Sequence, residues 1–384
     1  MTAGSVLQEL AEASEDSYTA FRSVARWKES TGGKAVGYFP VYFPEELAHS
    51  MGLLPVSLQG ASGGVSLDMA TAHTQSFVCS ISRSVFQMAL QGNLDVFDSL
   101  IFSNICDVAR NLSGITKRNV SKHIDYIHYP VNNGSAHAAQ YLKDEYLRIG
   151  AGLGRVAGAG VDDERLRASI ALFDRKRALL NRLVKLRRDR PELMPYTEWY
   201  SVVRGGATMP VEAYVAALGS YLEEVSGRQV KAMDKIRVAV VGNFCEQTPV
   251  MLMKVIEDAG CYVVNDEALI GERWLPQVGI EGADPLLSLA EAYVQNREPL
   301  TVRFHPEIDK QSHISRFIKE VRADGVIFCT PKFCEPALYD YMIYKSPLEK
   351  DRVPYLHLEY EESSSSFEHV RTMVETFAES ILFD

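Results

Sequence analysis

The sequence contains no stretch approaching the roughly 20 consecutive apolar residues that a membrane-spanning helix needs. Its first residues, MTAGSVLQELAEASEDSY, are acidic, whereas a secretory signal peptide begins with basic residues and continues with apolar ones. We therefore expect a cytoplasmic protein with no membrane partner. Basic residues are also in deficit: 40 Lys and Arg against 50 Asp and Glu give a formal net charge of −10. This charge disfavours binding to a polyanion, so we expect no nucleic-acid partner.

Several common catalytic motifs are missing as well. Lys34, in STGGKAV, lacks the leading glycine and the following Ser or Thr of a phosphate-binding P-loop, so this chain is not expected to bind ATP through such a loop. HExxH is absent. The glycine-rich stretch 150–160 (GAGLGRVAGAG) does not match GxGxxG, and we interpret it as a flexible loop rather than a phosphate cradle.

Cysteines are few and scattered, at positions 79, 106, 245, 261, 329 and 334. There is no CxxC pair and no dense cysteine framework in this long chain, which argues against structural disulfides. Each cysteine is therefore a buried core thiol, a reactive thiol or a metal ligand.

What the sequence does contain is a repeated order of apolar strands and helices, in a chain of 384 residues with 46% apolar and 23% charged residues. We predict an α/β fold with two similar parallel-sheet lobes and a helical segment between them. The predicted parts are an N-terminal helical segment at 1–33, a first α/β lobe at 34–133, a helical segment at 134–235 and a second α/β lobe at 236–384. The predicted strands are 35–43, 53–58, 96–104, 123–130, 236–244, 262–269, 325–333 and 353–361.

The helical segment carries a basic run from Arg165 to Arg190. Apolar residues within it recur at close to the 3.6-residue helical period. We interpret the basic residues as a solvated helix face, although they could also dock an acidic partner or the phosphates of coenzyme A.

Two cysteines occupy corresponding places in the two lobes. Cys106 directly follows the predicted strand 96–104, and Cys334 directly follows 325–333. Ligand sites form beyond the carboxyl ends of parallel strands, so these thiols are expected to face an interlobe cleft. Cys79 is expected near a helix start, where the helix dipole stabilises a thiolate. Spacing alone leaves two interpretations open, ordinary buried thiols or a zinc or iron–sulfur site.

The other three cysteines have different settings. Cys261 precedes a predicted strand and Cys329 lies inside an apolar run, so we interpret both as core thiols. Cys245, in GNFCEQTP, also follows a strand and is a candidate additional ligand.

Four stretches together resemble a known family. They are VYFPEELAHSMGLLPVSL, SFVCSISRS, SNICDVARN, and DGVIFCTPKFCEPALYDY followed by VPYLHLEYEESSSSFEHVRTMVETFAES. On these stretches, and most specifically on KFCEP, the chain resembles the 2-hydroxyacyl-CoA dehydratase and benzoyl-CoA reductase family over essentially its whole length.

The resemblance implies a cofactor and its ligands. In that family three cysteines hold a [4Fe-4S] cluster and leave one iron without a protein thiolate. Matched by motif, the ligands are Cys79, Cys106 and Cys334. Glu46 matches a family glutamate and is a candidate catalytic residue that orients substrate or protons. Its alternative role is a carboxylate that stabilises a helix N-terminus.

The resemblance also implies partners and a reaction. Family members pair two related cluster-bearing subunits in a heterodimer, and a separate ATP-hydrolysing iron–sulfur activator supplies single electrons. The segments YFPVYFPEEL and GNFCEQTP, with the short chain length, favour the smaller cluster-bearing subunit of an ATP-dependent benzoyl-CoA reductase, acting on an aromatic acyl-CoA. The alternatives are a subunit of a 2-hydroxyacyl-CoA dehydratase and a non-catalytic electron-relay or structural partner.

Overall fold

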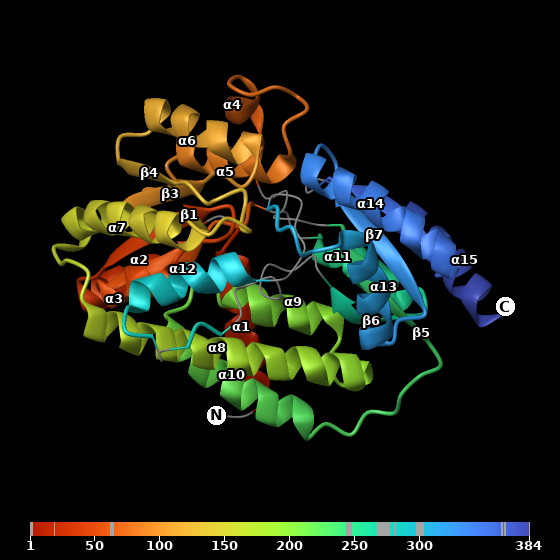
Figure 1. The fold of residues 1–384 in the computed structure, drawn as a ribbon. Coiled ribbons are helices and arrows are strands. Elements are labelled where there is room, and N and C mark those ends of the chain that lie inside the picture. The colour runs from red at the N-terminus through yellow and green to blue at the C-terminus, as the bar shows by residue number, and fades with distance from the viewer. Residues whose placement is uncertain are drawn as a thin grey trace.

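The computed structural model describes residues 3–18, 20–61, 65–242, 248–266, 277–279, 282–296, 303–361, 364 and 366–383. Figure 1 shows two sheets side by side, with long helices running beneath both. None of the helices in these ranges is long and apolar enough to cross a membrane.

Each lobe is built on a four-stranded parallel sheet, and the two sheets have the same topology. The strand orders are β2-β1-β3-β4 and β6-β5-β7-β8. In both lobes the second strand lies outside the first, and the chain then crosses over to the third and fourth. The predicted α/β fold with two similar parallel lobes is therefore confirmed. The strands are β1 (Lys34–Phe39), β2 (Leu53–Ser57), β3 (Ser99–Ser103), β4 (His123–Ile127), β5 (Ile236–Val241), β6 (Cys261–Asp266), β7 (Gly325–Pro331) and β8 (Tyr355–Tyr360).

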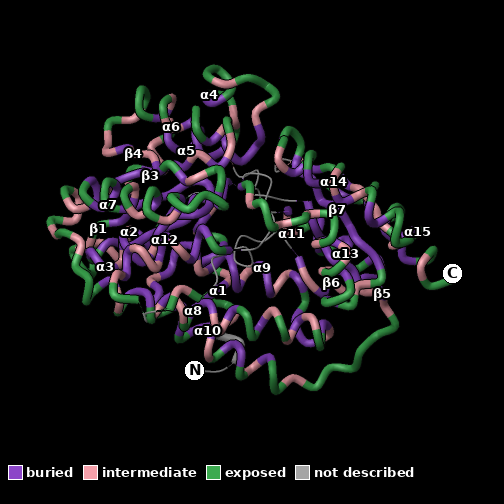
Figure 2. Tube along the Cα trace, in the orientation of Figure 1, coloured by how far each residue is buried: buried purple, intermediate pink, exposed green. Residues whose placement is uncertain are grey.

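Helices pack against both sheets, and the central strands are mostly buried, shown purple in Figure 2. Strands β2, β3 and β7 are buried along their whole length, which explains why they appear in the sequence as continuous apolar runs rather than alternating ones. The first lobe has α2 (Arg22–Thr31), α3 (Glu45–Ser50), α4 (Asp68–Thr71), α5 (Ser80–Leu90), α6 (Asp107–Asn119) and α7 (Ala138–Ala157), and the second has α11 (Val250–Asp258), α13 (Lys310–Val321), α14 (Glu335–Asp351) and α15 (Glu368–Leu382).

The remaining helices lie against the lobes from below. Helix α1 (Ala3–Asp16) packs on α9 (Tyr196–Gly205), and α10 (Val211–Ser226) packs on the 27-residue helix α8 (Asp163–Asp189). A short 3-10 turn, Pro191–Leu193, follows α8. Asp162 caps the start of α8, where its carboxylate accepts a hydrogen bond from the Arg165 N–H at 2.8 Å.

Helix α8 joins the two lobes through buried ion pairs. Near its middle, Lys176 pairs with Glu45 at 2.6 Å and Arg177 pairs with Glu46, both on α3 of the first lobe. Near its end, Arg187 pairs with Asp266 at the end of β6 in the second lobe, at 2.6 Å. The prediction of a solvated basic face is therefore wrong for these three cations, whose side chains are 3%, 7% and 0% exposed.

The domain boundaries stay a prediction, but one helix crosses between the predicted lobes. Helix α12 (Pro285–Gln295) lies within the predicted second lobe, yet it packs against α7 of the first. Its Tyr293 ring lies 4.6 Å from that of Tyr129, measured between centroids.

The glycine-rich stretch 150–160 is not a loop. Helix α7 continues through it to Ala157 and ends where Gly158 adopts a left-handed conformation with φ of +77°. A Cβ on Gly154 would lie 3.0 Å from the carbonyl oxygen of Ala159, so glycine there lets the chain fold back closely against the helix. The prediction of a flexible loop is wrong because these glycines serve close packing.

A pH-dependent contribution to stability arises where α11 meets α9. The Glu257 carboxylate accepts the Tyr196 N–H with both oxygens, at 2.9 and 3.0 Å, and burial raises its pKa from 4.5 to about 7. Because the pKa of Glu257 is higher in the folded protein, the protonated carboxyl group stabilises the fold at low pH. This contribution to the free energy of unfolding is fully present below about pH 4.5 and is lost as the pH rises through 7. Glu257→Gln, which stays neutral, is expected to gain up to about 3 kcal/mol over the wild type between pH 5 and pH 8. Urea unfolding at both pH values tests this, and an equal difference at the two would contradict it.

Candidate iron–sulfur site

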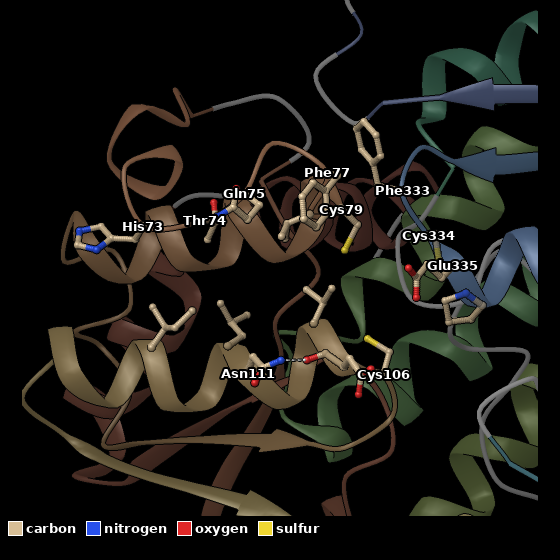
Figure 3. Close-up of a pocket in the computed structure, with 16 residues that line it drawn as sticks. His73, Thr74, Gln75, Phe77, Cys79, Cys106, Asn111, Phe333, Cys334 and Glu335 are labelled. Carbon is tan, nitrogen blue, oxygen red and sulfur yellow. Dashed lines mark hydrogen bonds between the residues drawn. The ribbon is translucent and has the colours of Figure 1, made fainter.

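Cys79, Cys106 and Cys334 line one cavity between the two lobes. Its volume is about 370 Å³, within the range of about 300–1,000 Å³ typical of small-molecule sites. Figure 3 shows the three side chains around this space, two from the first lobe and one from the second. Cys106 and Cys334 lie just beyond the carboxyl ends of β3 and β7. The structure therefore brings together the three cysteines that the sequence singled out.

Each of these cysteines is the N-cap of a helix. Cys79 caps α5, Cys106 caps α6 and Cys334 caps α14. A helix start presents free N–H groups and a positive partial charge, both of which stabilise a thiolate or an anionic group bound to it. Three helix starts therefore direct positive potential into one cavity.

Local contacts hold two of the thiols in place. The Ala109 N–H donates to the Cys106 sulfur at 3.4 Å, and the Cys79 sulfur lies 3.2 Å from the Ser82 hydroxyl oxygen. Burial raises the pKa of the Cys106 thiol, hydrogen bonds from the α6 backbone lower it, and the carboxylates of Asp107 and Glu335 raise it. Because Glu335 belongs to the second lobe, a carboxylate on the opposite side of the cleft contributes to the raised pKa of Cys106.

Phe333 is the residue before Cys334, and its backbone is left-handed, with φ of +64°. This conformation is uncommon for a bulky residue and concentrates at functional sites. It turns the chain sharply from β7 into α14, where the Cys334 N–H donates to the Pro331 carbonyl at 3.1 Å. Phe333 itself is 42% exposed and lines the cavity together with Phe77 of the other lobe.

The lining of the cavity can be compared with what two kinds of metal centre require. Among the described residues, no three His, Cys, Asp or Glu side chains are placed to hold a single metal ion. A single zinc ion would need its thiolates close around one point, with Zn–S distances of about 2.3 Å. An iron–sulfur cluster instead takes its thiolates on separate irons. Three thiols spread around one cavity, each at a helix start, fit the second kind of centre.

The other cysteines do not line this cavity. Cys261 and Cys329 are fully buried in the core of the second lobe, and burial raises the pKa of the Cys261 thiol to about 12. Their prediction as core thiols is confirmed. The five cysteines that the structure describes form no disulfide. Cys245, the candidate additional ligand, lies outside the described residues.

Glu46 is not among the residues that line the cavity. It is 1% exposed, lies in the first turn of α3 and pairs with Arg177 of α8. Its catalytic role stays a prediction, while the alternative of a carboxylate at a helix start matches this position.

One part of the cavity was not predicted from the sequence. Val108, Leu112 and Ile115 of α6, the helix that begins after Cys106, line the cavity as an apolar wall. Their spacing of four and then three residues places them on one helix face. That spacing is visible in the sequence, but it does not reveal that the face lines a cavity instead of the core.

Comparison with known proteins finds one matching family model and several similar subunits. A family model described as 2-hydroxyglutaryl-CoA dehydratase, D-component, matches residues 40–381. One of the subunits of the benzoyl-CoA reductase of Thauera aromatica is 33% identical over 364 residues, covering 94% of each chain. The lactoyl-CoA dehydratase subunit beta of Anaerotignum propionicum is 28% identical, covering 92% of this chain and 94% of that one. The (R)-phenyllactyl-CoA dehydratase beta subunit of Clostridium sporogenes is 27% identical, covering 93% and 94%.

Proposed function

The chain belongs to the 2-hydroxyglutaryl-CoA dehydratase, D-component family, and from this we propose that it is the [4Fe-4S]-binding subunit of an ATP-dependent benzoyl-CoA reductase. In this role it takes part in the one-electron reductive dearomatisation of an aromatic acyl-CoA in the cytoplasm. The observation that carries the proposal is the cavity with three N-cap thiols, Cys79, Cys106 and Cys334.

The protein's own residues would bind the cluster and tune it. When bound, the cluster supplies single electrons at low potential, and iron–sulfur potentials reach about −700 mV. The three thiolates would hold it, and the starts of α5, α6 and α14 would supply backbone N–H groups that stabilise its negative charge. Cys79 and Cys334 are each only 6% exposed, so the surrounding lobes keep water from two of the three ligand positions.

Two proteins would work with this chain. We expect a related cluster-bearing subunit, because the relatives named above are themselves subunits. A separate activator would hydrolyse ATP, since the sequence has no P-loop.

A 2-hydroxyacyl-CoA dehydratase is the second candidate. It is supported by the two dehydratase beta subunits, which match over almost the same share of the chain as the reductase subunit. Such an enzyme would remove water from a 2-hydroxyacyl thioester with the same thiolate site. The greater identity to the reductase subunit, 33% against 27% and 28%, favours the first candidate.

Oxygen-free purification tests the cluster and the reaction separately. We expect about four irons and four sulfides per chain and an EPR signal on reduction, as a [4Fe-4S] centre requires. With partner subunit, activator and ATP, benzoyl-CoA should be consumed and 2-hydroxyacyl-CoA thioesters should not. Iron-free protein would overturn the cluster, whereas iron-loaded protein that dehydrates 2-hydroxyacyl-CoA would favour the second candidate.

A further inference from the structure

Strand β4, which lies beside the strand that leads to Cys106, carries a tyrosine near its end. Tyr126 is aligned with Phe102 of β3 in the parallel register, and Cys106 follows the end of β3. Successive side chains of a strand point to opposite faces of the sheet. Helices α6 and α7 both pack against β4, and Asp125 pairs with Arg148 of α7 at 2.9 Å. Tyr126 therefore points away from α7 and toward α6, the helix that Cys106 caps.

The charges that act on the Tyr126 hydroxyl agree with this orientation. Burial raises the pKa of this hydroxyl to about 12; Arg110 of α6 lowers it, while Cys106 and Asp107 at the start of α6 raise it, as does Tyr141 of α7. The phenol therefore keeps its proton at neutral pH and is available as a hydrogen-bond donor.

The Tyr126 hydroxyl oxygen is shielded from solvent, yet it has no hydrogen-bond partner among the described residues. Leaving a buried polar group unpaired costs free energy, and a redox or catalytic role is one of the accepted reasons for it. The other first-lobe cysteine already has a hydroxyl beside it, since the Ser82 oxygen lies 3.2 Å from the Cys79 sulfur. Tyr126 is placed to provide the equivalent group for Cys106.

Hydrogen bonds tie the segment that carries Cys106 to the strand that carries Tyr126. Asn104, two residues before Cys106, donates its side-chain N–H to the Tyr129 carbonyl at 3.0 Å and accepts the Tyr129 N–H at 2.7 Å. Its backbone N–H donates to the Ile127 carbonyl at 3.3 Å. These three bonds extend the pairing of β3 and β4 past the end of β3, so the thiol and the phenol are held on one rigid unit.

We propose that Tyr126 donates its hydroxyl hydrogen to the sulfur of Cys106 when the cluster is bound, and so raises the reduction potential of the cluster. This role rests on the proposed function. A hydrogen bond to a ligand sulfur stabilises the reduced, more negative state of an iron–sulfur centre over the oxidised one. Tyr126 acts through Cys106 and makes no contact with substrate, so it is a positioning residue.

Removing the hydroxyl while keeping the ring tests this role. In Tyr126→Phe, the ratio of reduced to oxidised cluster at a fixed potential should fall about three- to tenfold, a downward shift of about 30–60 mV for a one-electron couple. Tyr141→Phe is the matched control, because it removes a hydroxyl from a neighbouring tyrosine that is 45% exposed, and it should leave the potential unchanged. Redox titration followed by EPR, on the full chain purified without oxygen, measures each potential.

A tyrosine fluorinated next to its hydroxyl, placed at position 126, tests the same bond with the opposite sign. Its phenol is more acidic and a stronger donor, so the potential should rise, and it retains the ring and hydroxyl if Tyr126→Phe fails to fold or to hold iron. Iron per chain is measured for every protein. An unchanged potential in iron-loaded Tyr126→Phe or fluorotyrosine protein would overturn this role and leave the cluster in place. Iron-free wild-type protein would overturn the cluster and this role together.

Discussion

Replacing Cys79, Cys106 or Cys334 by serine is expected to lower the iron content of the purified protein by roughly half or more and to reduce turnover by more than about 100-fold. Changes to groups that merely orient a metal ligand already cost about 10–100-fold, and loss of a ligand should cost more. The three positions should behave alike because each provides an N-cap thiol to the same cavity. Iron and sulfide analysis, EPR and substrate turnover provide the measurements.

The matched control is another buried cysteine of the same chain. Cys261 is fully buried in the second-lobe core, away from the cavity, so Cys261→Ser should keep its iron. It should lose about 1–3 kcal/mol of stability, because a hydroxyl replaces an apolar thiol in the core. If Cys261→Ser loses as much iron as the cavity variants, the losses reflect unfolding. If a cavity variant keeps full iron and activity, that cysteine is not a ligand.

The sequence was sufficient to predict the cysteine arrangement because it depends on local rules. Strand β7 is a continuous apolar run, so its end and the position of Cys334 beyond it could be read from composition. Parallel strands then place Cys106 and Cys334 at the same kind of edge in each lobe. The expected helix start at Cys79 gave the third thiol, the family resemblance implied that all three are cluster ligands, and the structure brings them to one cavity.

Contacts between distant segments could not be predicted in the same way. The pairing of Glu46 with Arg177 joins residues 131 apart, and a basic residue in a helical pattern appears the same whether it faces water or a buried carboxylate. Likewise, the spacing of the apolar residues in α12 predicts a helix with one buried face, but it does not predict that this face packs against α7. Nothing in the sequence around Asp266 indicates that this strand-end carboxylate pairs with a fully buried arginine.

Breaking that last pair should have the largest effect on stability. Arg187 and Asp266 are both 0% exposed, and the Trp199 indole N–H donates to the same carboxylate at 3.2 Å. Asp266→Asn removes the buried carboxylate that pairs with the Arg187 charge, so we expect a loss of about 3–5 kcal/mol in the free energy of unfolding. Urea denaturation measures it.

The exposed pair of Lys254 and Asp258 provides the control, since it has the same 2.6 Å separation but side chains 52% and 43% exposed. Asp258→Asn should change stability by less than about 1 kcal/mol, because solvent screens such pairs. Because Arg187 ties α8 to the second lobe while Arg177 ties it to the first, Asp266→Asn should also loosen the lobes around the cavity and lower iron retention. Equal stability losses in the two variants, or unchanged iron content in a destabilised Asp266→Asn protein, would show that α8 does not fix the position of one lobe relative to the other.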